Sequence, residues 1–303
     1  DVFNYIEMFY NPKRRHGTAG DTSPVEFERQ IDYLAENYQV VSLRTLVECL
    51  ERDAVPPRAV VITFDDGYAD TMRRAVPVLH RRRLPATVFV VTAGVGNRDL
   101  LWQHKLAWLI THEQEPRLEA ALAEAGVTGR ESGESMGRFV RRSFSGHVPD
   151  VIESVLRSVG KSGASLAAEL RPYLEPEDIR GAASELIEFG NHTHTHPVLS
   201  ALSYEDQTRE VAAARDRILE WTGQFPLALA YPFGQRQHYS AQSKRIAQET
   251  WHRAALDMRR RLNQGVVDPF ELSRKPAVTG SQRLFEQMIE DWPAHSGELP
   301  PGG

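Results

Sequence analysis

The feature that most constrains the fold is AVVITF at residues 59–64, an unbroken run of apolar and β-branched residues followed by two aspartates. Such a run is typical of a strand that is covered on both faces. Residues 70–84 then have helical spacing, and ATVFVVT at 86–92 is a second run of the same kind. The order strand, helix, strand predicts a parallel βαβ unit.

The second half of the chain continues this alternation. The expected helices cover residues 176–186, 203–223 and 240–251, and the expected strands cover 186–190, 226–234 and 252–258. Pro176 suits a first helical turn, Ser203 with Asp206 three residues later resembles a capping box, and Gly223 suits a helix end. The pattern predicts an α/β fold, either a parallel sheet or a (β/α) barrel, in which catalytic residues gather where strands end.

Residues 94–175 depart from the alternation. They are helical in pattern, charged and interrupted by Gly and Ser, so we expect an inserted helical subdomain or lid. The expected organisation is an N-terminal segment at 1–22, a domain at 23–285 that contains this insertion, and a C-terminal tail at 286–303.

Composition argues against several classes of protein. The 303 residues are 41% hydrophobic and 25% charged, as in globular proteins, and the net charge of −5 provides no general basic field for nucleic acid. The single cysteine, Cys49, excludes an internal disulfide, and its place in the helical pattern SLRTLVECLE predicts a buried thiol. No window reaches the roughly 18–20 apolar residues of a membrane span, and no signal-peptide pattern is present. We therefore expect a cytoplasmic or envelope-associated location.

Two groups of polar residues follow expected strands. Asp65 and Asp66 end the first strand, and Gly67 allows a sharp turn there. Three histidines occupy alternate positions after the strand at 186–190: His192, His194 and His196. Adjacent residues leaving a strand point in different directions, so one carboxylate can ligate a metal while the other faces a substrate. Two imidazoles and a carboxylate leave coordination positions open, as in catalytic zinc sites. The alternatives are a capped turn for the aspartates and an accidental exposed run for the histidines.

These motifs carry a family resemblance. Residues 23–278 resemble the polysaccharide deacetylases (carbohydrate esterase family 4, the NodB-like homology domain) through TFDDGY, HTHTHP, SPVEFERQIDYL, LPATVFV, LLWQHKLAWL, AYPFG and DPFELSR. The resemblance implies a distorted (β/α)7 barrel that removes acetyl groups from N- or O-acetylated glycans with a divalent metal, most often Zn²⁺. It implies Asp65 as the general base and Asp66, His192 and His196 as metal ligands. His194 fills a variable position that does not bind the metal.

The third motif of the family would supply contacts to the substrate and the oxyanion, through a backbone N–H near Tyr231 and the residues Tyr231, Pro232 and Phe233. The alternative for these three residues is a strand end followed by a turn. The ligand set also suits cobalt, nickel or iron.

The sequence departs from the family pattern in two places. Ala230 and Tyr231 stand where many members carry an arginine that orients the catalytic base. Ser273 and Arg274 stand where a Leu-x-His segment would supply the general acid. The acid is therefore unassigned, with His238 and His252 as candidates that could equally be surface residues.

The first 28 residues carry a second resemblance, to the C-terminal tail of integrase-type insertion-sequence transposases, through YIEMFYNPKRRH and SPVEFE. A fusion junction at residues 16–24 would leave the barrel without its first strand and expose two sheet edges. Apolar residues of the first ten fall near one face of a helix, so we expect an amphipathic helix to cover the gap: Val2, Phe3, Ile6 and Phe9 or Tyr10. The alternative is a divergent leader helix over residues 1–20.

The sequence predicts a metal-dependent polysaccharide deacetylase that acts on the amide or ester bonds of an acetylated glycan, with no nucleic-acid partner and no membrane span. The alternative is a catalytically impaired glycan-binding relic created by insertion-element fusion. A third hypothesis, a DNA-transaction protein, lacks the acidic triad that a transposase needs.

Overall fold

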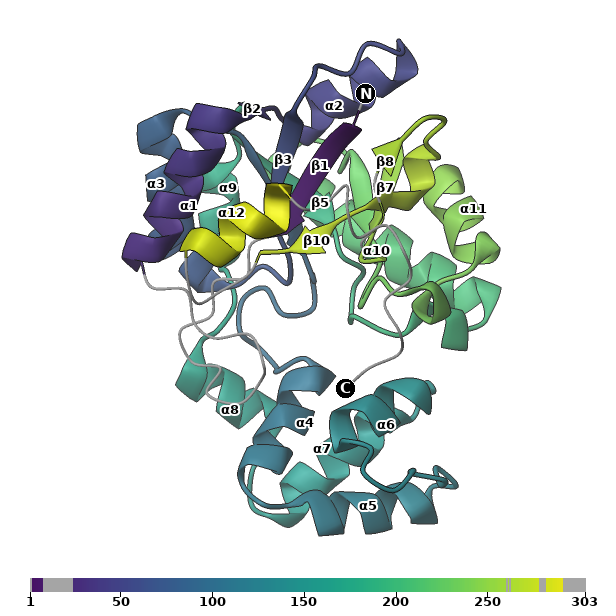
Figure 1. Ribbon diagram of the computed structural model, residues 1–303. Coiled ribbons are helices and arrows are strands. Elements are labelled where there is room, and N and C mark those ends of the chain that lie inside the picture. Colours follow the sequence, from purple (N-terminus) through teal and green to yellow (C-terminus); the bar gives the residue numbers. More distant parts are fainter. Residues whose placement is uncertain (1, 8–23, 260, 262, 278–281, 291–303) are drawn as a thin grey trace.

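The computed structural model describes residues 2–7, 24–259, 261, 263–277 and 282–290 (Figure 1). The strands are β1 Val2–Glu7, β2 Gln39–Val40, β3 Ala59–Phe64, β4 Ala86–Val90, β5 Ile187–Asn191, β6 Ala228–Ala230, β7 Ala254–Asp257, β8 Asn263–Gln264, β9 Leu272–Ser273 and β10 Lys275–Pro276. The helices are α1 Pro24–Asn37, α2 Leu43–Glu51, α3 Val76–Arg82, α4 Trp102–Thr111, α5 Glu115–Glu124, α6 Met136–Arg142, α7 Val148–Ser158, α8 Gly163–Leu170, α9 Pro176–Ala182, α10 Tyr204–Thr222, α11 Ala241–Glu249 and α12 Gln282–Glu290. Short turns of helix complete the list: a π turn, η1 Thr71–Ala75, and the 3-10 turns η2 Leu199–Ala201, η3 Arg236–His238 and η4 Pro269–Glu271.

The strands form one curled, mainly parallel sheet in the order β10-β1-β3-β4-β5-β6-β7-β9. Its two ends meet in a single segment, because β9 pairs with β7 and β10 pairs with β1, and only Arg274 separates β9 from β10. Within the described residues the path therefore has seven strand positions, as the family resemblance implied. The α/β fold that we predicted is confirmed.

Strand β3 consists of the unbroken run AVVITF, and its packing explains why nearly every residue of the run is apolar. Val60, Ile62 and Phe64 pack with residues of α1 and α3 in one cluster, while Ala59 and Val61 pack with interior residues of β4, β6 and β7 in another. All six residues of the strand are buried. The strand is thus covered on both faces, and its period of two directs every second side chain into the barrel.

Close packing inside the barrel also explains one glycine. A Cβ on Gly190 would lie 2.4 Å from ring carbons of Phe89, so only glycine at this position of β5 leaves room for that ring.

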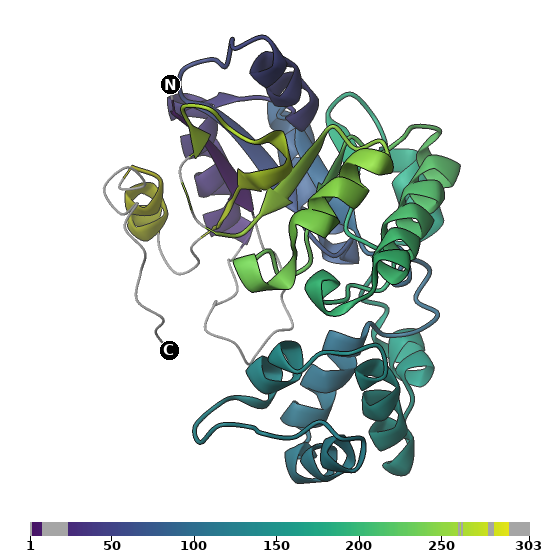
Figure 2. The same cartoon turned by 90° about the vertical axis from the view of Figure 1, so that its right-hand side faces the viewer.

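The helices surround the sheet on two sides, and α4 to α8 form a layer below it in Figure 1. Figure 2, turned by 90°, shows the same separation. All five helices fall within residues 94–175. Their apolar side chains form one cluster with Val91, which follows β4, and Val198, which follows the histidine motif. The inserted helices therefore pack against the end of the sheet where its parallel strands finish. The boundaries that we expect for the domains remain predictions.

Helix α10 begins and ends at the residues that its sequence indicated. The Ser203 hydroxyl accepts a hydrogen bond from the Asp206 N–H, and Gly223 adopts a left-handed conformation with φ of 71° at the other end.

The expectation for the first residues is wrong. Residues Val2–Glu7 form strand β1, which pairs in parallel with β3 on one side and β10 on the other, so the first strand position is filled. VFNYIE consists largely of residues with high strand propensity, and pairing with two strand edges outweighs a helical pattern only ten residues long. Residues 8–23 lie outside the described residues, and the transposase-like junction stays a prediction.

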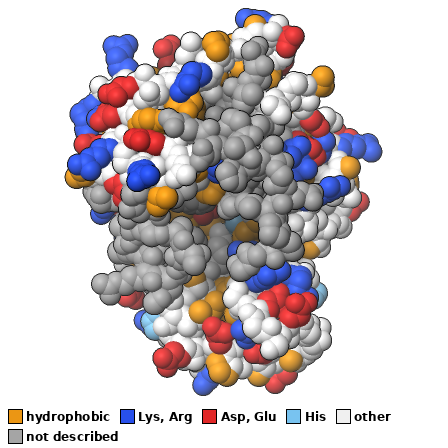
Figure 3. Space-filling view, in the orientation of Figure 1, with side chains coloured by type: hydrophobic (Ala, Val, Ile, Leu, Met, Phe, Trp, Pro, Cys, Tyr) orange, Lys and Arg blue, Asp and Glu red, His pale blue; other side chains and the backbone are white. Residues whose placement is uncertain are grey.

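Two further expectations concern Cys49 and the surface. Cys49 lies on α2 but is only partly buried, because it is at the margin of the helix face that Leu43, Leu46 and Val47 bury. On the face shown in Figure 3, Lys and Arg side chains lie interspersed with Asp and Glu side chains. Among the described residues, no helix is both long enough and apolar enough to cross a membrane.

Candidate metal centre

Asp65 and Asp66 directly follow β3, at the end of the sheet that faces the inserted helices. Asp66 has a φ of 69° and Gly67 a φ of 70°, so two successive residues are left-handed and turn the chain sharply. Aspartate tolerates this conformation better than most residues, and a Cβ on Gly67 would already lie 3.1 Å from a methyl group of Val90. The turn leaves an oxygen of each carboxylate near Nε2 of His192, with Oδ2 of Asp65 at 3.5 Å and Oδ1 of Asp66 at 3.6 Å.

The histidine motif is held by a network of side-chain to backbone hydrogen bonds. The Asn191 side chain accepts a bond from the Thr193 N–H at 2.8 Å, and the Thr193 hydroxyl accepts one from the His196 N–H at 3.1 Å. On the outer side, one Glu210 carboxylate oxygen accepts the N–H groups of His194 and Thr195 at 3.0 and 2.7 Å. Thr193 and His196 themselves have φ values of 67° and 61°. Strained backbone that is fixed by its surroundings is common at functional sites.

Three side chains converge from these two segments. The Nε2 atoms of His192 and His196 each lie 3.6 Å from Oδ1 of Asp66. One ligand atom from each residue lies within 4.8 Å of the others. Donor atoms around one tetrahedral zinc ion lie about 3.3 Å apart, so small shifts would bring this group onto a cation.

The hydrogen bonding of Asp66 and His192 leaves one atom of each able to ligate a cation. Oδ1 of Asp66 is buried and accepts no hydrogen bond. Nδ1 of His192 lies 2.8 Å from the carbonyl oxygen of Ala230, which can only accept, so this nitrogen carries the proton and Nε2 presents its lone pair. A buried acceptor without a partner is costly unless a cation or donor meets it. The residues therefore fit a divalent metal ion.

Burial lowers the pKa of His196 to about 3, so this imidazole is neutral near pH 7. Burial opposes ionisation of Asp66, but the charged forms of the nearby His196 and His192 outweigh it, and the pKa of Asp66 lies below its ordinary value. Neutral imidazoles and an ionised carboxylate are the forms that ligate metals.

Asp65 is held by Arg274, a contact that the sequence did not reveal. The two terminal nitrogens of Arg274 each lie 2.8 Å from a different oxygen of Asp65, and one of them also contacts the Thr63 hydroxyl at 3.1 Å. Arg274 is fully buried, and Oδ2 of Asp65 lies 3.5 Å from Nε2 of His192. A bidentate guanidinium fixes the plane of the carboxylate beside the candidate metal ligands Asp66, His192 and His196, here called the metal-ligand group. The arginine missing before Pro232 is thus replaced from the segment that joins the two ends of the sheet.

The three residues singled out in the AYPFG motif, Tyr231, Pro232 and Phe233, differ in how close they lie to the candidate metal ligands. The Tyr231 N–H donates to Leu256 in the sheet, its hydroxyl donates to Phe270, and its ring stacks on Tyr239. This amide is already paired, so the oxyanion contact that we expected near Tyr231 does not come from its N–H. Pro232 is buried. The Phe233 ring does reach the site, because its centroid lies 4.6 Å from that of His196.

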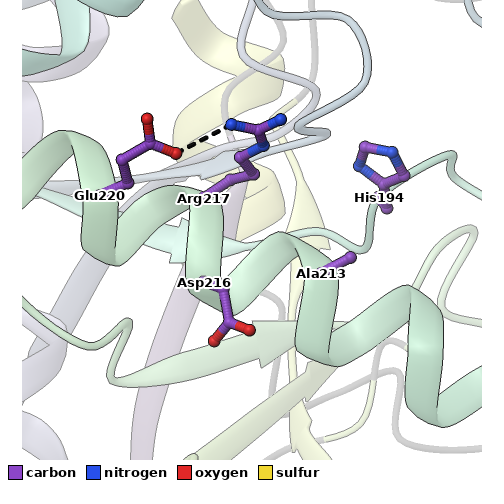
Figure 4. Close-up of a pocket in the computed structure, with 5 residues that line it drawn as sticks. All are labelled: His194, Ala213, Asp216, Arg217 and Glu220. Atoms are coloured by element: carbon purple, nitrogen blue, oxygen red, sulfur yellow. Dashed lines mark hydrogen bonds and ion pairs between the residues drawn. The ribbon is translucent and has the colours of Figure 1, made fainter.

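The other histidines singled out from the sequence lie outside the cluster. His194 bonds Thr92 and lines a shallow pocket of ≈ 400 Å³ on α10 with Asp216 and Glu220 (Figure 4). His252 is buried and bonds Asn191 and Thr250, and burial lowers its pKa to about 4, so it is a core residue rather than a surface one. His238 packs edge-on against Phe233, and burial lowers its pKa to about 4 as well.

Helix α4 contributes neighbours that sequence reasoning missed. The Trp102 indole N–H donates to the His196 carbonyl at 2.9 Å. The ring nitrogens of His104 contact two hydroxyls, that of Tyr68 at 2.7 Å and that of Tyr173. The segment LLWQHKLAWL was part of the family resemblance, but nothing in its spacing indicated that it would reach the histidine motif.

Known proteins resemble this chain in sequence and in fold. YxkH of Bacillus subtilis (strain 168) is 33% identical over 89 residues, which cover 29% of this chain and 32% of that protein. The poly-beta-1,6-N-acetyl-D-glucosamine N-deacetylase of Staphylococcus aureus (strain MSSA476) is 27% identical over 122 residues, 40% of each protein. The chain thus spans less than half the length of these relatives. The structure of IcaB from Ammonifex degensii matches with a TM-score of 0.61 and 18% identity, over 96% of this chain and 97% of that one.

The likeness to IcaB supports the fold alone, because the sequence identity is low. The polysaccharide deacetylase family model, in contrast, matches residues 52–254, more than half of the chain, including both the aspartate and the histidine motifs. This chain belongs to the polysaccharide deacetylase family.

Proposed function

We propose that this protein is a metal-dependent hydrolase that removes acetyl groups from N- or O-acetylated polysaccharide. One observation carries the proposal: a buried carboxylate oxygen without a hydrogen bond faces two imidazole nitrogens, beside a second carboxylate that a buried arginine holds. Family membership supports the reaction class and the acetylated glycan as substrate.

Asp66, His192 and His196 would hold the cation. Zinc is our first candidate for two nitrogens and one oxygen, and cobalt, nickel or iron suit the same donors. When bound, a divalent cation would polarise an acetyl carbonyl and make water more acidic. The bond from His192 to the Ala230 carbonyl keeps the ligating nitrogen in place.

Asp65 would act as the general base and take a proton from the attacking water. Its two oxygens are fixed by Arg274, so the carboxylate cannot rotate away from the reacting atoms. Asp65 is mostly buried, and the two-pronged contact with the guanidinium provides the countercharge that a buried carboxylate needs. Phe233 covers one side of His196 and would limit the access of water.

The catalytically impaired relic is not favoured. That hypothesis depended on the missing arginine, on the altered segment that would carry the general acid and on a missing first strand. The contact of Arg274 with Asp65 and the pairing of β1 with β3 remove the first and the third of these arguments. The general acid remains unassigned. His104 lies near the site and contacts two tyrosine hydroxyls, whereas the low pKa of His238, about 4, argues against His238 as an acid near pH 7.

The test is acetate release from acetylated glycans by the purified chain, with and without a chelator, beside Asp65→Asn. We expect chelation to abolish release, re-added Zn²⁺ or Co²⁺ to restore it, and Asp65→Asn to lower kcat by roughly 10²-fold or more. Release that survives both treatments would contradict the proposed chemistry.

A further inference from the structure

Two aromatic side chains lie exposed on the surface. Phe225 and Trp251 are 44% and 67% exposed, and they are the aromatic members of the large exposed hydrophobic residues in the described chain. Their ring centroids lie 5.4 Å apart at an interplanar angle of 81°. The Arg215 guanidinium lies 5.5 Å from the Trp251 ring centroid and 6.0 Å from that of Phe225. Exposed apolar groups that gather in this way mark surfaces that bind a ligand or partner.

The backbone at Trp251 does not favour a tryptophan. Trp251 follows the last turn of α11, where its N–H bonds the Gln248 carbonyl and the next N–H, of His252, bonds the Ala247 carbonyl. This is the Schellman arrangement, and Trp251 occupies its left-handed position with a φ of 70°. Glycine or asparagine is usual there, and Gly223 has the same conformation after α10. The local fold thus gives no reason for this exposed side chain.

A pocket of ≈ 470 Å³ begins at Phe225. Its walls come from the first residues of β4, β5 and β6 and from the start of α2, so it opens at the amino-terminal end of the barrel, opposite the metal-ligand group. Its polar side chains include Arg44, Thr87, Glu188 and Gln224. Thr87 and Glu188 are register partners on β4 and β5.

Two polar atoms of this pocket lack partners. The Thr87 hydroxyl is buried, with 2% of the residue exposed, and makes no hydrogen bond. Oε1 of Glu188 pairs with Arg44 at 2.8 Å, whereas Oε2 is buried without a partner. Leaving a buried hydroxyl and a carboxylate oxygen unsatisfied is unfavourable for folding. A ligand that carries several hydroxyl groups would satisfy both.

We propose that this pocket and the aromatic pair form a second glycan-binding site, separate from the metal centre. The proposal rests on the proposed function for its ligand, a polysaccharide chain. One sugar residue would donate a hydroxyl to Oε2 of Glu188 and exchange a hydrogen bond with Thr87. The next residue would place its apolar C–H face on Trp251, because an aromatic ring offers a large rigid surface to such groups. The site would retain the polymer while another part of it reaches the metal centre.

The test is the migration of the 303-residue chain in native gels that contain glycol chitin or acetylated xylan. We expect at least one polymer to retard the chain, and Trp251→Asn and Thr87→Val each to weaken retention by about 3- to 10-fold. The same two substitutions should keep or raise the melting temperature, by about 1–4 °C, because one removes backbone strain and the other an unsatisfied hydroxyl. Val266→Asn, which removes an exposed apolar side chain outside the pocket, should leave retention unchanged.

The outcomes separate this proposal from the deacetylase itself. Absence of retardation by either polymer, or retention unaffected by Trp251→Asn and Thr87→Val, would overturn the second site even if the chain releases acetate. Retention that the two substitutions weaken, without any acetate release, would leave the second site standing and contradict the proposed reaction. A change in oligomeric state on Trp251→Asn, measured by light scattering, would indicate that the aromatic pair packs against protein and would also overturn the proposal.

Discussion

Replacing Arg274 by methionine tests how the general base is held. Arg274 is fully buried and binds both oxygens of Asp65, so Arg274→Met would leave a buried carboxylate without its countercharge. Breaking one partner of a buried pair usually costs about 3–5 kcal/mol of unfolding free energy. We expect a loss of this size in urea denaturation, and a fall in kcat for acetate release of roughly 10²-fold.

The control is the same substitution in the Asp65→Asn background. In that background the buried guanidinium is the charge without a partner, so Arg274→Met should be neutral or stabilising. The difference between the two costs measures the coupling of the pair, and we expect it to exceed about 2 kcal/mol. Arg274→Lys, which keeps the charge but not the two-pronged contact, should fall between wild type and Arg274→Met in both measurements.

Equal costs of Arg274→Met in the two backgrounds would refute this reasoning. Coupling below about 0.5 kcal/mol is what two independent sites show. Arg274 would then stabilise the join between β9 and β10 through packing alone, and Asp65 would be oriented by another group.

Three further predictions concern stability and the segment that carries the histidine motif. Burial lowers the pKa of His252 to about 4, below its value of 6.5 in the unfolded chain, so the unfolded state binds the proton first and the chain loses stability as the pH falls below 6.5. Between pH 7 and 5 the loss in unfolding free energy is about 2 kcal/mol, and urea denaturation of His252→Gln should lack this loss. The same dependence of unfolding free energy on pH in His252→Gln and wild type would contradict the prediction. Glu210→Ala removes three hydrogen bonds to His194 and Thr195, and should weaken Co²⁺ binding in a titration by about 10- to 100-fold. The control, Glu205→Ala on the same helix, should leave the affinity for Co²⁺ unchanged. Equal affinities of the two variants would count against a positioning role for Glu210. Deleting residues 1–7 removes a strand that pairs with β3 and β10 and should lower the denaturation midpoint, and an unchanged midpoint would show that β1 contributes nothing.

The sequence predicted features that depend on neighbouring residues. The run at 59–64 is strand β3 because its residues suit burial on both faces, and α10 begins and ends at the residues that cap it. The two polar motifs were expected to meet because both follow parallel strands, and the 3.6 Å separations between Asp66 and the two histidines agree with that expectation.

Features that depend on distant pairing could not be predicted. Arg274 is 209 positions from Asp65, and no local pattern indicates their contact. The apolar positions of residues 2–10 suit a helix face, but pairing with β3 and β10 makes residues 2–7 a strand. Likewise, His104 and Trp102 lie on an inserted helix whose sequence does not specify which end of the sheet it covers.

The most direct test of the central claim is anomalous X-ray scattering from crystals of the 303-residue chain grown with zinc, recorded on both sides of the zinc absorption edge. We expect one strong peak within about 2.0–2.2 Å of Nε2 of His192, of a ring nitrogen of His196 and of a carboxylate oxygen of Asp66. A map with no peak among these three side chains, at zinc concentrations that support acetate release, would contradict the account.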